Sequence, residues 1–157
     1  EATRALVILG ASVAATLANL GNLARLQGDM RASMGYYARA REIYEETEGG
    51  VCHGLASTLV GMGRVHLELG VHESAIFMLE RALRIREATL GPSHPRVADA
   101  RYNIGNVLRQ LGRDDEALAL FEQAFEVAGD TTCGLEVKMF KDKGNAFGLL
   151  AVLKEQK

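Results

Sequence analysis

Four asparagines with a repeated spacing are the residues of this chain best suited to bind a ligand. Asn19 and Asn22 are three residues apart, and Asn103 and Asn106 repeat that spacing. On a helix, this spacing places both side chains on one face. A carboxamide is both donor and acceptor, so it can pair with the peptide bond of an extended segment. The pattern indicates a polypeptide ligand, but amides solvated on an exposed face, or bonded across neighbouring repeats, would explain it too.

Arginines and apolar side chains are expected on the same helix face as these asparagines. The residues are Arg25, Arg64, Arg109, Tyr102 and Leu67. Arginine pairs with carboxylates through two parallel hydrogen bonds, which favours an acidic partner segment with an apolar anchor. A solvated charged face is the alternative, and Glu68 and Asp99 dilute the positive charge.

No residue spacing in the chain is typical of catalysis or metal binding. The motifs GxSxG, HExxH and GxGxxG and the phosphate-binding P-loop are absent. His66 is expected as a satisfied core or groove histidine, and His94, between two prolines, as a turn residue. Cys52 and Cys133 form no CxxC or other ligand pattern. We therefore expect no enzyme activity, cofactor or metal ion, and a cytoplasmic location without structural disulfides.

Composition favours a soluble, all-helical chain. The 157 residues are 48% hydrophobic and 24% charged, and the formal net charge of −2 argues against nucleic acid as the main partner. The two prolines, Pro92 and Pro95, leave the rest of the chain open to helix formation. The uncharged stretch between Arg4 and Arg25 is long enough for a membrane span, but it contains polar residues and belongs to a repeat. A membrane partner is therefore not expected.

The chain repeats itself with a period of 42 residues. Three columns of small residues share this spacing: Gly21, Gly63 and Gly105; Gly28, Gly70 and Gly112; Ala40, Ala82 and Ala124. The period defines units at residues 13–54, 55–96 and 97–138. In the second unit one amphipathic stripe runs from Leu55 to Leu69, Gly70 stops it, and a second stripe runs from Ala75 to Ile85. Each unit is thus expected to be a pair of antiparallel helices, with Gly63 permitting a close helix approach.

These columns resemble the tetratricopeptide repeat. The third unit shows the pattern as Ile104-Gly105, Gly112, Ala117, Phe121 and Ala124. The long period and the stretch "ALRIREATLGPSHPRVADA" are similar to the kinesin light chain subtype, and "YNIGNV" is similar to repeats of the LGN/Pins group. The first unit departs from the pattern at Ser33, and the middle unit has Gly61 and Arg64 where the others have asparagines. The resemblance implies that the first helices line a concave surface, where asparagines hold the backbone of a bound peptide.

The sequence therefore predicts one all-α domain over residues 1–157. It would be an α-solenoid of three stacked helical hairpins, with residues 139–157 as a terminal helix or partial fourth repeat. Residues 1–12 fall outside the register and are expected to close a preceding helix. The predicted function is a scaffold or adaptor that binds a peptide of a partner protein in its concave groove. A self-associating structural array and a sensor that responds to a ligand or peptide remain the alternatives.

Overall fold

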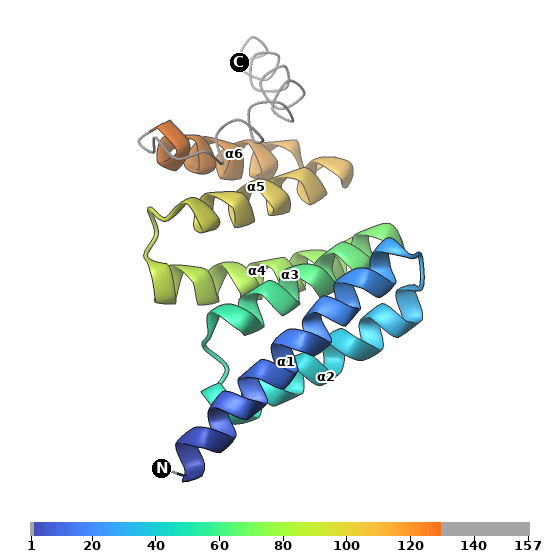
Figure 1. Ribbon diagram of the computed structural model, residues 1–157. Coiled ribbons are helices and arrows are strands. Elements are labelled where there is room, and N and C mark those ends of the chain that lie inside the picture. Colours follow the sequence, from blue (N-terminus) through green and yellow to red (C-terminus); the bar gives the residue numbers. More distant parts are fainter. Residues whose placement is uncertain (1, 130–157) are drawn as a thin grey trace. The chain divides into compact units, whose positions relative to one another are not determined.

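The computed structural model describes residues 2–129, which form α-helices joined by short turns (Figure 1). The helices are α1 (Ala2–Leu26), α2 (Met30–Glu48), α3 (His53–Glu68), α4 (His72–Leu90), α5 (Pro95–Gln110) and α6 (Asp114–Gly129). Consecutive helices pair as α1–α2, α3–α4 and α5–α6. The predicted all-α fold of antiparallel helical hairpins is confirmed. The chain divides into two compact units, Glu1–Pro92 and Ser93–Lys157.

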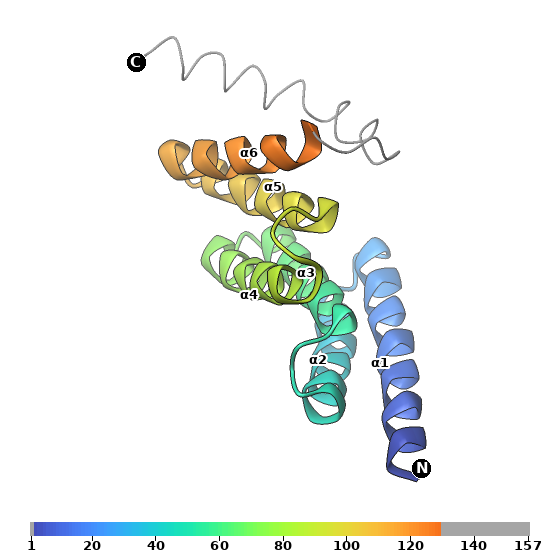
Figure 2. The ribbon, with the colours of Figure 1, turned by 90° about the vertical axis from the view of Figure 1, so that its left-hand side faces the viewer.

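In the first unit two hairpins pack side by side. Helix α3 packs against its partner α4 and also contacts α1 and α2 of the preceding hairpin (Figures 1 and 2). Alanines and larger apolar side chains fill the space between these helices, and the fully buried ones include Ala14, Tyr37, Leu59 and Leu79. In the second unit α5 and α6 pair around Phe121, whose side chain is also fully buried.

The helix ends follow from local residue chemistry. The Asp29 carboxylate accepts a hydrogen bond from the Ala32 backbone N–H at 2.9 Å and caps the N-terminus of α2. The Cys52 sulfur accepts one from the Leu55 N–H at 3.3 Å in α3, and His94 Nδ1 accepts from the Arg96 N–H at 3.1 Å in α5. After α3 the chain turns at Gly70, whose φ of 74° is costly for residues with a side chain. His94, which was expected to be a turn residue, is the N-terminal cap of α5.

The repeated mid-helix glycines lie against large side chains of the second helix of each hairpin. A Cβ atom added at Gly21 would lie 2.9 Å from the Tyr37 ring, and one at Gly105 would lie 2.7 Å from the Phe121 ring. At Gly63 it would lie 3.0 Å from Leu79 Cγ. The predicted close helix approach is confirmed, because nothing larger than glycine fits these places without movement.

Some expectations from the sequence were wrong. Residues 2–12 do not belong to a separate preceding helix, because α1 runs without a break from Ala2 to Leu26. Leu69 was expected to be the last residue of the apolar stripe of α3, but its side chain is 55% exposed. The helix ends one residue earlier, at Glu68. His66 is half-buried, and its Nδ1 is buried without a hydrogen-bond partner among the described residues, so it is not a satisfied core histidine.

Other expectations stay predictions. Residues 130–138 of the third repeat and the terminal helix expected at 139–157 lie outside the described residues. The assignment of residues 1–157 to one domain is also untested.

Candidate functional site

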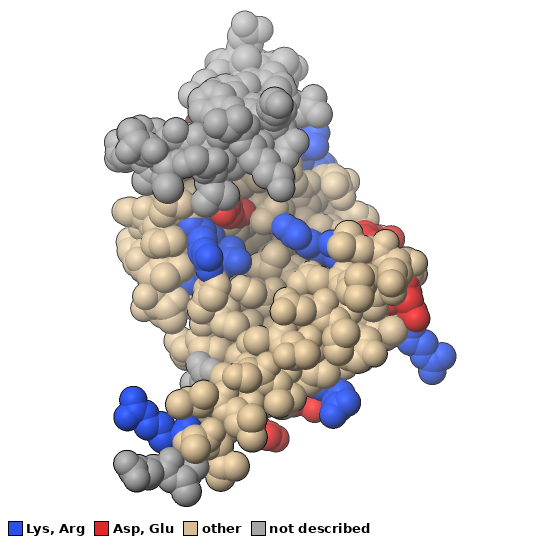
Figure 3. Space-filling view, viewed as in Figure 1, with Lys and Arg blue, Asp and Glu red and all other residues tan. Residues whose placement is uncertain are grey.

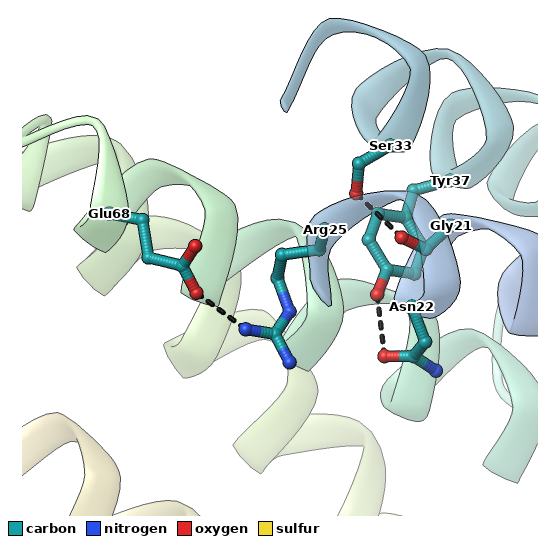
Figure 4. Close-up of polar contacts among 6 residues, drawn as sticks. All are labelled: Gly21, Asn22, Arg25, Ser33, Tyr37 and Glu68. Atoms are coloured by element: carbon teal, nitrogen blue, oxygen red, sulfur yellow. Dashed lines mark hydrogen bonds and ion pairs between the residues drawn. The ribbon is translucent and has the colours of Figure 1, made fainter. Parts of the chain in front are cut away.

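The first candidate site is formed by α1 and α3, and its central contact joins Asn22 to Tyr37. Tyr37 extends from α2, is 1% exposed, and donates its hydroxyl hydrogen to Asn22 Oδ1 at 2.7 Å (Figure 4). Asn22 itself lies on the exposed side of α1. Because the amide oxygen is held by Tyr37, the amide nitrogen points away from the hydrogen bond (Figure 4). Asn22 is therefore held with its donor group directed away from Tyr37.

The Tyr37 hydroxyl keeps its proton under all ordinary conditions. Burial raises the pKa of Tyr37 above its usual value of 10.0, and the nearby positive charges of Arg25 and Arg64 oppose this shift without cancelling it. A protonated phenol can donate to the amide oxygen throughout the physiological pH range. The orientation of Asn22 is thus insensitive to pH in the physiological range.

Tyr37 also explains why the middle repeat lacks an asparagine at the position of Asn19 and Asn103. That position is Gly61 on α3, where an added Cβ would lie 2.5 Å from Tyr37 Cζ and 2.6 Å from its hydroxyl oxygen. The tyrosine occupies the space that a side chain would need. The repeat pattern alone did not indicate this role of Tyr37. The signal available was the coincidence of a tyrosine and a glycine at positions where other repeats have neither.

The arginines of the first unit differ in their partners. Arg25 Nη1 lies 2.5 Å from Glu68 Oε1, so this ion pair links α1 to α3 (Figure 4). The Arg25 side chain is 16% exposed, and its Nε is buried without a hydrogen-bond partner among the described residues. Arg64 is exposed, and none of the ion pairs within residues 2–129 includes it. Of Arg25 and Arg64, Arg64 is therefore the arginine that is accessible to a ligand.

The second candidate site lies on α5 in the unit Ser93–Lys157. Tyr102, Asn103 and Asn106 are half-buried there, and Arg109 is exposed. The Tyr102 ring contacts the Phe121 ring, with centroids 5.5 Å apart and planes tilted by 50°. Phe121 occupies the position equivalent to Tyr37 but has no hydroxyl, so it cannot give Asn106 the hydrogen bond that Asn22 receives.

The asparagines, the arginines and Tyr102 chosen from the sequence thus separate into two sets. Asn19, Asn22, Arg25 and Arg64 belong to the first unit, where Asn19 is exposed on α1. The remaining four belong to the second unit. Within residues 2–129 no group of three or more His, Cys, Asp or Glu side chains is placed to hold a metal ion.

The hairpins and their 42-residue columns define an all-α helical-repeat protein. The family model described as tetratricopeptide repeat matches residues 12–88 and 56–130, which together cover most of the chain. The chain belongs to the tetratricopeptide repeat family. No curated protein is significantly similar to it in sequence.

Several solved structures share this helical-repeat fold. BtubC (BKLC) from P. vanneervenii is 25% identical, with a TM-score of 0.70 over 74% of this chain and 47% of that one. A putative kinesin light chain with nearly identical TPR-like repeats from Podosopora anserina is 16% identical, with a TM-score of 0.73 over 89% and 68% of the two chains. The N-terminal domain of stress-induced protein-1 from C. elegans is 18% identical, with a TM-score of 0.62 over 85% and 95%.

These comparisons establish a coarse function. The chain is a protein–protein interaction module, in a repeat family that is a non-catalytic interaction fold. It spans about half the length of BtubC.

Proposed function

We propose that the exposed side of α1 and α3 binds an extended peptide of a partner protein, with Asn22 as a fixed donor to the peptide's backbone. The observation that carries this proposal is the hydrogen bond from the buried Tyr37 hydroxyl to Asn22 Oδ1. An exposed asparagine on a helix ordinarily samples several rotamers. Here one rotamer is held before any ligand arrives, so less conformational entropy is lost on binding.

The neighbours of Asn22 suit a peptide ligand. Asn19 is exposed three residues earlier on α1, and its amide offers both a donor and an acceptor. Arg64 is exposed on α3 and supplies a positive charge without an ion-pair partner among the described residues. Arg25 is already paired with Glu68. The proposed peptide therefore places an acidic side chain toward Arg64, while its backbone carbonyl accepts from Asn22 Nδ2.

The equivalent residues of α5 are proposed to bind peptide backbone in the second unit. Asn103 and Asn106 have the same spacing as Asn19 and Asn22, and Tyr102 and Arg109 accompany them. Because Phe121 lacks the hydroxyl of Tyr37, the amide of Asn106 is not fixed by that residue. Asn106 can therefore donate or accept, and its contribution is less specific. We propose that this module acts in the cytoplasm as an adaptor.

The test begins by selecting a binding peptide from a random library displayed against the intact chain. Its affinity is then measured by fluorescence anisotropy for the double variants Asn19→Ala/Asn22→Ala and Asn103→Ala/Asn106→Ala. Loss of one neutral hydrogen bond is expected to weaken binding by about 3- to 10-fold. Glu42→Ala is the matched control, because Glu42 is an exposed residue of α2, a helix that carries none of these asparagines. Circular dichroism confirms that each variant is folded.

Tyr37→Phe separates a positioning role from a packing role. Phenylalanine keeps the ring against Gly21 and Gly61, and the chain already uses it at Phe121. The variant should weaken binding about as much as loss of one hydrogen bond, and only when Asn22 is present. If both asparagine double variants bind with unchanged affinity, the proposal fails. Tyr37→Phe is also made in the Asn22→Ala variant. If it weakens binding there by the same factor as in the unmodified chain, Tyr37 does not act through Asn22.

A further inference from the structure

The charged residues around the Tyr37 hydroxyl are two arginines and one glutamate. Besides burial, which raises the pKa of Tyr37, the charges of Arg25, Arg64 and Glu68 affect it, so these three groups lie around one point of the first unit. The other charged residue of α1 is Arg4, near its opposite end. Figure 3 accordingly shows a surface without Lys, Arg, Asp or Glu along most of the course of α1. Two positive charges and one negative charge leave this cluster with a net charge of +1.

Glu68 holds Arg25 by a single contact. Arg25 Nη1 lies 2.5 Å from Glu68 Oε1, and Nε of Arg25 has no hydrogen-bond partner among the described residues. An arginine can hold a carboxylate by two parallel hydrogen bonds. The chain contains such a pair, in which Arg113 donates to Glu116 through Nε and Nη2, each at 2.8 Å. The contact with Glu68 therefore uses less than the full bonding capacity of Arg25.

The position of Glu68 allows a ligand to replace it. The Glu68 side chain is 38% exposed and that of Arg25 is 16% exposed. Ion pairs near the surface contribute little to stability, because water solvates the separated carboxylate well. A carboxylate from a bound peptide can thus take the place of Glu68 at small cost. The exchange also brings little gain, because one carboxylate replaces another.

The pair is not a general requirement of the repeat. The 42-residue period makes Leu67 and Gln110 the equivalents of Arg25 and Glu68 in the following repeats, and these two residues cannot form an ion pair. A purely structural role for Glu68, as a link between α1 and α3, is the alternative explanation. It predicts that removing the charge of Glu68 changes stability and leaves the choice of ligand unaffected.

We propose that Glu68 is a specificity-determining residue of the α1–α3 site, because it occupies Arg25 in place of a ligand carboxylate. The inference rests on the proposed function, in which the peptide lies along α1 and α3 and pairs one acidic side chain with Arg64. While Glu68 holds Arg25, a second acidic side chain of the peptide gains little affinity. Without the charge of Glu68 both arginines are available, and the site prefers a peptide with two acidic side chains.

The test compares peptides selected by three chains. One random peptide library is panned against the unmodified chain, Glu68→Gln and Glu42→Gln, and the selected peptides are sequenced. Glutamine keeps the size of the side chain and an acceptor oxygen, and it removes only the charge. Glu42→Gln is the matched control, because it makes the same change in net charge at an exposed residue of α2. We expect the peptides selected by Glu68→Gln to carry about one more acidic residue than the others.

Affinity measurements then identify the arginine responsible. A fluorescein-labelled peptide with two acidic residues, taken from the Glu68→Gln selection, is titrated with each chain and followed by fluorescence anisotropy. It should bind Glu68→Gln about tenfold more tightly than the unmodified chain, which is the effect of one hydrogen bond to a charged group in a partly exposed site. Adding Arg25→Gln to Glu68→Gln should abolish this gain. Circular dichroism confirms that each variant is folded.

Equal numbers of acidic residues in the peptides from all three selections would overturn the inference. An equal gain in affinity for Glu42→Gln would assign the effect to net charge, and a gain that survives Arg25→Gln would exclude Arg25, so either result would also overturn it. The proposed function is tested separately with Asn19→Ala/Asn22→Ala. If that variant binds the peptide with unchanged affinity, the proposed function fails, whereas a gain that depends on Arg25 would still support the role of Glu68.

Discussion

Replacing Gly61 by alanine should destabilise the protein through one identifiable contact. The new Cβ would lie 2.5 Å from Tyr37 Cζ, whereas carbon atoms normally approach to about 3.5 Å, so something must move by about 1 Å. Tyr37 has no room to withdraw, because its ring already lies against Gly21 and is 1% exposed. Overpacking of this kind costs about 1–3 kcal/mol, and the better helix propensity of alanine returns about 1 kcal/mol. The net loss should be about 0–2 kcal/mol.

A double-mutant cycle with Tyr37→Leu isolates this contact. Leucine lacks Cζ and the hydroxyl, and the chain uses it at the equivalent Leu79. In that background Gly61→Ala should be neutral or stabilise by up to about 1 kcal/mol, so the coupling energy is about 2 kcal/mol. Gly35→Ala is the control for propensity alone, because a Cβ at Gly35 meets nothing within 4 Å.

The measurement is the free energy of unfolding from urea denaturation of the four proteins in the cycle. Additivity within about 0.5 kcal/mol would show that Tyr37 and Gly61 do not compete for the same space. The steric account of the missing asparagine in the middle repeat would then be wrong.

Three further predictions concern stability. Ser33→Ala should cost about 1 kcal/mol in urea denaturation, because the buried Ser33 hydroxyl donates to the Gly21 carbonyl at 2.8 Å. Gly70→Ala should lower the unfolding free energy by about 1–2 kcal/mol, since φ is 74° there; an unchanged value would contradict that strain. Because the folded-state pKa of Tyr37 is raised above 10.0, the stability this group contributes is complete below about pH 10 and is lost as pH rises through the folded value. The stability difference between the protein and Tyr37→Phe should therefore shrink above pH 10 in thermal unfolding scans.

The repeat period predicted the fold well because residues 42 positions apart occupy the same place in successive hairpins. Gly21, Gly63 and Gly105 occupy the same place in each hairpin, and each lies against the large side chain of the partner helix. A glycine that recurs in a helix interior has few physical explanations other than close packing. Hairpin pairing and turn positions follow from these columns with little ambiguity.

Burial on α1 could not be predicted from the same columns. Leu20 belongs to the apolar stripe in sequence, and its equivalent Met62 is 3% exposed, but Leu20 itself is 39% exposed. The difference is not in the residue but in its neighbour, because α3 has the α1–α2 hairpin beside it. Periodicity identifies which face of a helix is apolar, but it does not show whether another helix covers that face.

The repeat pattern also could not predict the hydrogen-bond partners of the asparagines. Equal spacing predicted equal roles for Asn22 and Asn106, but the role of each depends on the residue one helix away. Tyr37 fixes Asn22 as a donor, and Phe121 cannot do the same for Asn106. Tyr37 in turn requires a glycine at position 61 of the next repeat. One substitution from phenylalanine to tyrosine thus changes two positions of the proposed site, so repeats with the same backbone present different chemistry to a ligand.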